Sequence, residues 1–232
     1  EIYTPRFNHD GWALGFKITR VMQQDGKAFK EARRFTKMLS KAKAETRNIL
    51  ANNVLNNGYT SGKTQEGGDG VILFSASHPS LVGNQSNTIS VNADLSEAAL
   101  ESIYIQVRNA KDLRGIRANL KTRKIVINVA QEPDLYRILN SKLRVGTPDN
   151  DPNFVKDNGI FPGGVVSSPY ISDLDAFYVL TDVMDGLKWY DRYESPIETD
   201  NEFDTKNACY SIMCRYSQGW INFLGAYASP GA

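Results

Sequence analysis

The longest regular pattern of apolar and polar positions runs from Lys27 to Asn57. This stretch contains no Pro or Gly and consists mostly of good helix formers, which predicts a helix about 46 Å long. Asp25 is the expected N-cap, and the Asn-Asn-Gly sequence ending at Gly58 is a natural stop. At about 100° per residue, one face is apolar: Ala28, Ala32, Phe35, Leu39, Ala42, Ile49 and Leu50. The opposite face, called the basic face below, is cationic: Lys27, Lys30, Arg33, Arg34, Lys37 and Lys41.

The remaining elements of the first half are shorter. Residues 12–22 are rich in aromatic and β-branched side chains and predict a strand, and VILF at 71–74 predicts another. The five glycines within 58–70 predict a loop between the helix and the second strand. Asp94 and Glu97 form a capping box, which predicts a second helix with Leu100, Ile103, Val107 and Ala110 on its apolar side.

The second half alternates strands with short helices and loops. RKIVINVA at 123–130 predicts a buried strand, and Pro133 opens a third helix. Residues 146–164 are rich in Pro, Asp and Asn and predict a long surface loop. VVSSPYI and AFYVL predict two further strands. Residues 188–197 and 203–220 then alternate as long antiparallel partners, with the acidic sequence ETDNEFD at the turn.

Composition is that of an ordinary globular protein, with 41% apolar and 23% charged residues among 232. The net charge of +1 conceals a polarity, since residues 1–57 carry a net +6 and ten carboxylates fall within 173–204. Cys209 and Cys214 are five residues apart, so on one strand they face opposite sides and cannot form a disulfide with each other. Two cysteines form no secreted disulfide framework, which favours a reducing compartment. No apolar run approaches the roughly 18 residues that a membrane span requires.

Catalytic and cofactor motifs are weak. NGYTSGKT at 57–64 resembles a phosphate-binding loop around Lys63, but the first glycine is displaced and the loop follows a helix instead of opening one. His9 and His78 are too few for a zinc site, and a turn role is expected for His78 before Pro79. The carboxylates of 173–204 lack the alternation of a calcium loop and predict a solvated acidic rim. We therefore expect no enzyme, no cofactor and no metal site.

The basic face is the one electrostatic feature that suggests a partner. Its six cations could lie against phosphate backbones without reading a base sequence, although most charge runs of this kind are simply solvated. No stacking aromatic residues interleave with the charges, which argues against single-stranded nucleic acid.

The order of motifs resembles the major capsid (major head) proteins of tailed bacteriophages, especially the Mu-like branch. The resemblance rests on an ITR strand, the helix ending ANNVLNNG, LFSASHPS, DLSEAALE and RKIVINVAQEPDLYRILNSKLRVGTPDND, followed by DGLKWYDRYES, FDTKNACYSIMCRYSQGW and SPGA. It implies an α+β fold of the Hong Kong 97 type. In that fold a peripheral domain packs a long spine helix on a long-stranded antiparallel sheet, and an α/β axial domain surrounds the capsomer axes.

The resemblance also implies a division of the chain. Residues 1–22 would form the returning half of an extended loop, 23–92 and 186–232 the peripheral domain with spine helix 27–57, and 93–185 the axial domain. The N-terminal arm and the outgoing half of the loop are not in this sequence, which begins at Glu1 without Met and so indicates a processed or trimmed product.

The implied function is self-assembly into the icosahedral head shell that encloses the phage genome. The implied partners are other copies in hexamers and pentamers, packaged double-stranded DNA bound without specificity, and scaffolding, portal or decoration proteins, with no membrane. The implied location is the virion, after assembly in the host bacterial cytoplasm. Three alternatives stay open: an encapsulin-type compartment shell, a nucleoid-like DNA-binding protein that uses the basic face, and a nucleotide-dependent enzyme that needs Lys63 to bind phosphate.

Overall fold

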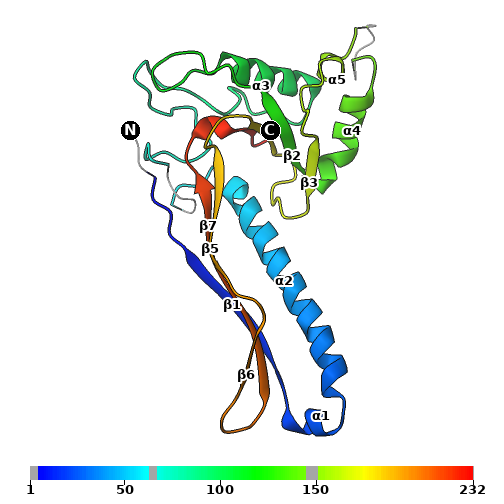
Figure 1. Ribbon diagram of the computed structural model, residues 1–232. Coiled ribbons are helices and arrows are strands. Elements are labelled where there is room, and N and C mark those ends of the chain that lie inside the picture. Colours follow the sequence, from blue (N-terminus) through cyan, green and yellow to red (C-terminus); the bar gives the residue numbers. More distant parts are fainter. Residues whose placement is uncertain (1–4, 63–66, 145–150, 232) are drawn as a thin grey trace. The chain divides into compact units, whose positions relative to one another are not determined.

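A computed structural model describes residues 5–62, 67–144 and 151–231 (Figure 1). The chain divides into two compact units. Unit 1 comprises Glu1–Arg6, Asn52–Lys188 and Gly219–Ala232, so far as these ranges are described, and unit 2 comprises Phe7–Ala51 and Trp189–Gln218. The mixture of helices with two largely antiparallel sheets confirms the α+β class.

Unit 2 is built from one long helix and one antiparallel sheet. The sheet has the order β1-β7-β5, from β1 (Asp10–Ile18), β7 (Ala208–Trp220) and β5 (Leu187–Glu194), and β6 (Glu198–Asn201) also pairs with β7. The helix is α2 (Ala28–Asn56), within one residue of the predicted bounds at both ends. A short helix, α1 (Arg20–Gln24), connects β1 to α2.

The pattern of side chains explains why α2 and this sheet pack together. The predicted alternation on β7 is confirmed between Ser211 and Tyr216: Ile212, Cys214 and Tyr216 are buried, whereas Ser211 and Met213 are exposed. β1 pairs with β7 so that Trp12 lies opposite Cys214 and Leu14 opposite Ile212. Because alternate residues of adjacent strands share one face, both strands present apolar side chains to the same side.

Unit 1 is built around the sheet β3-β2-β4-β8, from β3 (Val165–Ser168), β2 (Thr122–Asn128), β4 (Phe177–Thr181) and β8 (Ala226–Ser229). β2 is buried as predicted, with Ile125 and Ile127 at 0% exposure. Among the described residues of this unit, three helices accompany the sheet: α3 (Glu97–Asn109), α4 (Glu132–Asn140) and α5 (Phe154–Asp157). The apolar side of α3 faces the core with all four predicted residues buried, and Pro133 lies in the first turn of α4. Two 3₁₀ turns, η1 (Val129–Gln131) and η2 (Phe223–Gly225), complete this unit.

Several sequence predictions about helix ends are wrong. The strand predicted for 12–22 ends at Ile18, because Thr19 accepts a hydrogen bond from Met22 N and caps α1. Asp25 is consequently the C-cap of α1 instead of the N-cap of α2. The second helix is capped by Ser96, whose hydroxyl accepts from Ala99 N, and not by the predicted box at Asp94.

Three predictions about strands and loops are also wrong. Residues 71–74 form no strand, although Leu73 and Phe74 are buried. The predicted surface loop 146–164 contains α5, and Asn153, Val155 and Ile160 within it are buried. The acidic turn after β5 includes β6, which pairs with β7. Apolar content alone did not reveal these placements, because each depends on contacts with distant segments.

Candidate functional site

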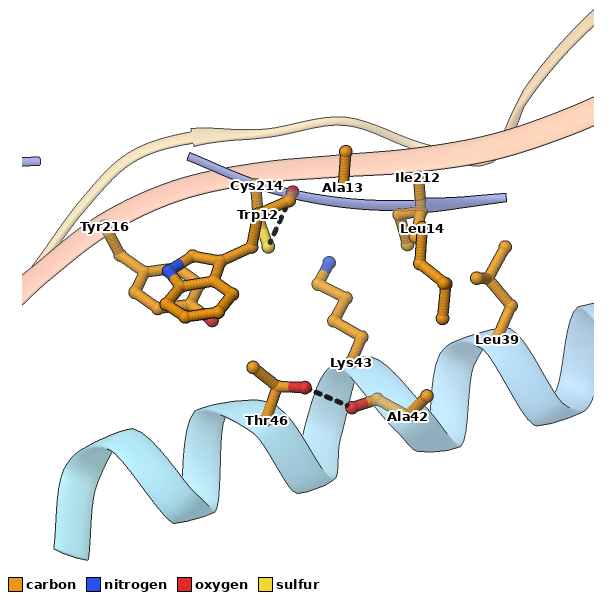
Figure 2. Close-up of a pocket in the computed structure, with 10 residues that line it drawn as sticks. All are labelled: Trp12, Ala13, Leu14, Leu39, Ala42, Lys43, Thr46, Ile212, Cys214 and Tyr216. Carbon is orange, nitrogen blue, oxygen red and sulfur yellow. Dashed lines mark hydrogen bonds between the residues drawn. The ribbon is translucent and has the colours of Figure 1, made fainter. Parts of the chain in front are cut away.

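The inner face of α2 and the sheet of unit 2 meet along a narrow apolar seam. Phe35 of α2 lies against Phe16 of β1, with ring centroids 5.4 Å apart, and Leu39 is 4% exposed. Beside Leu39 the helix and sheet leave an open cavity of about 180 Å³, lined by Trp12, Leu14, Ile212 and other side chains shown in Figure 2. Of the predicted apolar face, Phe35, Leu39 and Ala42 lie along this seam, whereas Ile49 is 40% exposed.

Charged residues lie along the edge of this apolar contact between α2 and the sheet. Lys43 donates a hydrogen bond to Glu194, and this contact, with Arg47 adding to it, holds the pKa of the Glu194 carboxyl below its ordinary value. Arg47 also contacts Asp191 at 3.0 Å, and Asp191 accepts from Trp189 Nε1 at 2.8 Å. Asp191 and Glu194 belong to the predicted solvated acidic rim and are exposed, and they also bind cations of α2.

Lys43 and Arg47 lay outside the predicted basic face. The guanidinium of Arg47 lies 5.2 Å from the centre of the Trp189 ring, and Trp189 in turn packs on Tyr216 at 4.7 Å. Burial raises the pKa of Tyr216 to about 12. The sequence signal for this cluster was the position of both cations at the edge of the apolar stripe, where long side chains can reach over a sheet.

All six residues of the basic face are exposed, as predicted. Arg34 and Lys41 form loose helix-surface ion pairs with Glu31 at 3.6 Å and Glu45 at 3.5 Å. The other four cations, Lys27, Lys30, Arg33 and Lys37, have no ion pair within the part of the chain that the structure describes.

Four of the six cations of the basic face border a shallow groove on the outer side of α2. The groove has a volume of about 550 Å³. Its lining is Phe29, Lys30, Arg33, Arg34, Lys37 and Met38. Phe29 is 68% exposed and Met38 55% exposed, and the guanidinium of Arg33 lies 4.3 Å from the centre of the Phe29 ring. Lys27 and Lys41 are not part of the groove lining. The sequence predicted these cations but not the two exposed apolar side chains at their edges.

The segment 198–207, called the acidic tip below, consists of β6 and the turn that joins it to β7. Its centre is Glu202, which accepts hydrogen bonds from Lys17 Nζ at 2.7 Å and from the Thr205 hydroxyl at 2.5 Å. These donors lower the pKa of Glu202 to about 2. Glu198, Asp200 and Asp204 are exposed, and Phe203 is 83% exposed.

The remaining candidate residues do not form a catalytic arrangement. His78 is fully buried, contrary to the predicted turn role: Nδ1 lies 2.7 Å from Asp69 Oδ2, Nε2 lies 3.2 Å from the Leu73 carbonyl, and the ring stacks on Phe223. Lys63 lies outside the described residues. Among the residues described, no group of His, Cys, Asp and Glu could hold a metal ion, and no helix is long and apolar enough to cross a membrane. Cys209 and Cys214 are both free.

Comparison with known proteins gives one family and one fold. The sequence profile described as phage capsid protein matches residues 7–229. No curated protein matches the sequence. Among solved structures, the chain is similar to a protein of Mycobacterium phage Patience, with 11% identity, 96% of this chain and 69% of that chain covered, and a TM-score of 0.57. A capsid of an empty GTA particle gives 11% identity, coverage of 97% and 74%, and a TM-score of 0.54. A virus-like particle from Pyrococcus furiosus gives 11% identity, with 95% of this chain and 75% of that chain covered, and a TM-score of 0.52.

Proposed function

The chain belongs to the phage capsid protein family and is a capsid shell protein, and from this premise we propose that its copies assemble into a closed icosahedral head around the phage genome. The match of the family profile over residues 7–229 carries this proposal, because it spans both structural units. The fold is the α+β arrangement that the sequence predicted. The assignment of this chain to the Mu-like branch of the family stays a prediction.

The proposed mechanism is geometric. Many copies join through repeated interfaces into hexamers and pentamers, and complementary charged surfaces set their orientation. We assign 23–92 and 186–232 to a peripheral domain, 93–185 to an axial domain, and 1–22 to the returning half of an extended loop. Packaged double-stranded DNA would touch the inner surface without sequence readout. Assembly in the host cytoplasm, with scaffolding, portal or decoration proteins, belongs to the same proposal.

An encapsulin-type compartment shell is the second candidate, and the similarity to a virus-like particle from Pyrococcus furiosus supports it. Both functions use a closed shell, so the fold does not distinguish them. The contents of the shell distinguish the two functions, because a compartment shell holds a protein cargo and a phage head holds DNA. A nucleoid-like protein is disfavoured by the net charge of +1 and by the ten carboxylates within 173–204.

Electron microscopy of the full-length product, at increasing protein concentration, tests the proposal. We expect uniform closed shells. Persistent monomers at high concentration would contradict it. Nucleic acid extracted from shells formed in phage-infected cells then separates the two candidates: long double-stranded DNA supports the phage head, and a single abundant protein cargo without DNA supports the compartment.

A further inference from the structure

The groove on α2 combines two kinds of side chain that a single nucleic-acid role does not explain. Its cations would suit phosphate oxygens, but Phe29 and Met38 are more than half exposed among them. Phosphate contacts are made by cationic and polar groups, and they leave such apolar surface in water. Exposed apolar side chains beside a charged surface, here at the two edges of the cations, are instead typical of a protein interface.

The acidic tip offers the complementary surface. Phe203 is the most exposed aromatic side chain of unit 2 among the described residues, at 83%. Asp204 follows it in sequence, and Asp200 and Glu198 lie just before it on β6. None of these three carboxylates has an ion pair within the described residues. The tip therefore presents one large apolar group beside three exposed carboxylates, and Lys206 Nζ lies 4.5 Å from the centre of the Phe203 ring.

The backbone of the acidic tip is held in place before any partner arrives. Glu202 N donates to Asn207 O at 3.0 Å, and Lys206 N donates to Glu202 O at 2.9 Å. Lys17 of β1 contacts the Glu202 carboxylate, and Asn207 Oδ1 accepts from Arg20 N. A surface that is already ordered loses less conformational entropy on binding.

We propose that the acidic tip of one copy docks in the α2 groove of a second copy. Phe203 packs against Phe29 at one edge of the groove, and the tip carboxylates lie against Lys30, Arg33 and Lys37. Within one copy the tip is bonded to Lys17 and Arg20 while Phe203 and the groove both stay exposed, so the contact comes from another subunit. Since groove and tip are different surfaces, the contact is head-to-tail and can repeat around a ring. This inference rests on the proposed shell function and names one of its interfaces.

Apolar substitutions distinguish a protein partner from DNA. Phe203→Ser on the tip and Phe29→Ser with Met38→Ser in the groove leave every charge unchanged. We expect each to raise the protein concentration needed for shell formation, measured by light scattering and electron microscopy, by at least about tenfold, as expected for removal of an interface anchor. Retention of random-sequence duplex DNA per assembled subunit should not change.

Charge exchange tests the pairing itself. Asp200→Lys with Asp204→Lys on the tip, and Arg33→Glu with Lys37→Glu in the groove, should each impair assembly. The four changes together should restore it to within about threefold of the original chain, because opposite charges again face each other. Lys41→Glu is the matched control on the same helix outside the groove, and it should leave assembly unchanged. Circular dichroism of each variant monomer confirms that α2 is intact.

The outcomes separate the inference from the proposed function. If the original chain forms no shells, the shell function fails. If it forms shells, but the apolar variants assemble normally and the exchanged charges rescue nothing, the docking inference is wrong while the function stands. If all cation changes, Lys41→Glu included, reduce DNA retention and leave shell formation intact, the basic face serves DNA and the inference is overturned.

Discussion

The two units solve the problem of burying apolar surface in different ways. Unit 1 has a continuous core with helices and loops around its sheet, and it includes fully buried residues such as Ile125, Phe177 and Ala228. Among its described residues, unit 2 buries only six apolar side chains: Ile18, Leu39, Ala208, Ile212, Cys214 and Tyr216. A single helix on a single sheet cannot enclose a core. Unit 2 therefore leaves large side chains in solvent, and this is the surface that neighbouring subunits would cover.

The polar contacts of the two units differ in the same way. Unit 1 is joined by buried uncharged hydrogen bonds, such as Asn153 Nδ2 to Ile138 O at 2.6 Å and Asn128 Nδ2 to Ile171 O at 2.7 Å. Unit 2 is joined by ion pairs at its surface, Arg47 to Asp191 among them. Exposed ion pairs are screened by salt and contribute little, whereas buried polar groups are costly to leave unpaired. We expect mutations to be most damaging in unit 1, whereas the carboxyl groups whose pKa neighbouring cations lower, Glu194 and Glu202, lie in unit 2.

The largest expected difference comes from the same substitution in each unit. Leu100→Ala on α3 removes a side chain that is 1% exposed in a closed core, and should lower the free energy of unfolding by about 4–5 kcal/mol. Leu39→Ala on α2 should cost only about 2–3 kcal/mol, because the adjoining open cavity lets water or neighbouring side chains fill the space. Urea unfolding of the monomer measures both. Equal losses would mean that the two units are packed alike.

Asn87 provides the next test, as a buried hydrogen-bond hub of unit 1. Its amide donates to the carbonyl oxygens of Leu73 at 2.6 Å and Ala226 at 3.1 Å, and its Oδ1 accepts from Ser75 N at 2.9 Å. Asn87→Ala leaves these buried groups without their partner and should lower the free energy of unfolding, measured by urea unfolding of the monomer, by about 3–4 kcal/mol. Asn84→Ala, at an exposed position three residues earlier, is the control, and it should leave the free energy of unfolding nearly unchanged. Hydrogen exchange should rise mainly in unit 1.

The sequence predicted the elements that depend on local periodicity. The bounds of α2, the inward residues of β7 and the buried side of α3 all follow from repeats of 3.6 or 2 residues. It did not predict contacts between segments far apart in the chain. Nothing near Glu194 indicates that Lys43 will bind it, and nothing near His78 indicates that Asp69 and Phe223 will enclose it. The α2 groove was half predicted, since charge is visible in a sequence but exposure of Phe29 is not.

A glycine in β1 tests how closely the sheet of unit 2 is packed. A Cβ on Gly15 would lie 2.7 Å from Tyr210 O, which is a backbone atom of the paired strand. Gly15→Ala must therefore shift β1 against β7, and it should lower the free energy of unfolding by about 1–3 kcal/mol. Gly11→Ala is the matched control on the same strand, because its Cβ would meet nothing nearer than Arg215 Cγ at 3.8 Å. Thermal unfolding of the monomer followed by circular dichroism measures both, and similar melting temperatures for the two variants would contradict this packing.

The smallest expected effect is the response of the acidic tip to pH. Hydrogen bonds from Lys17 and Thr205 lower the folded-state pKa of Glu202 from 4.5 to about 2. Since the folded-state pKa is below the ordinary one, the contact stabilises the tip fully above about pH 4.5 and is lost as the pH falls toward 2. The same partner raises the pKa of Lys17, so at the alkaline end the contact is lost only as the pH rises above 10.5. We expect the amide signals of residues 202–207 to lose protection from hydrogen exchange below about pH 4, while those of β2 do not change. Glu202→Gln should abolish this transition, and a transition that persists in that variant would assign it to another carboxylate.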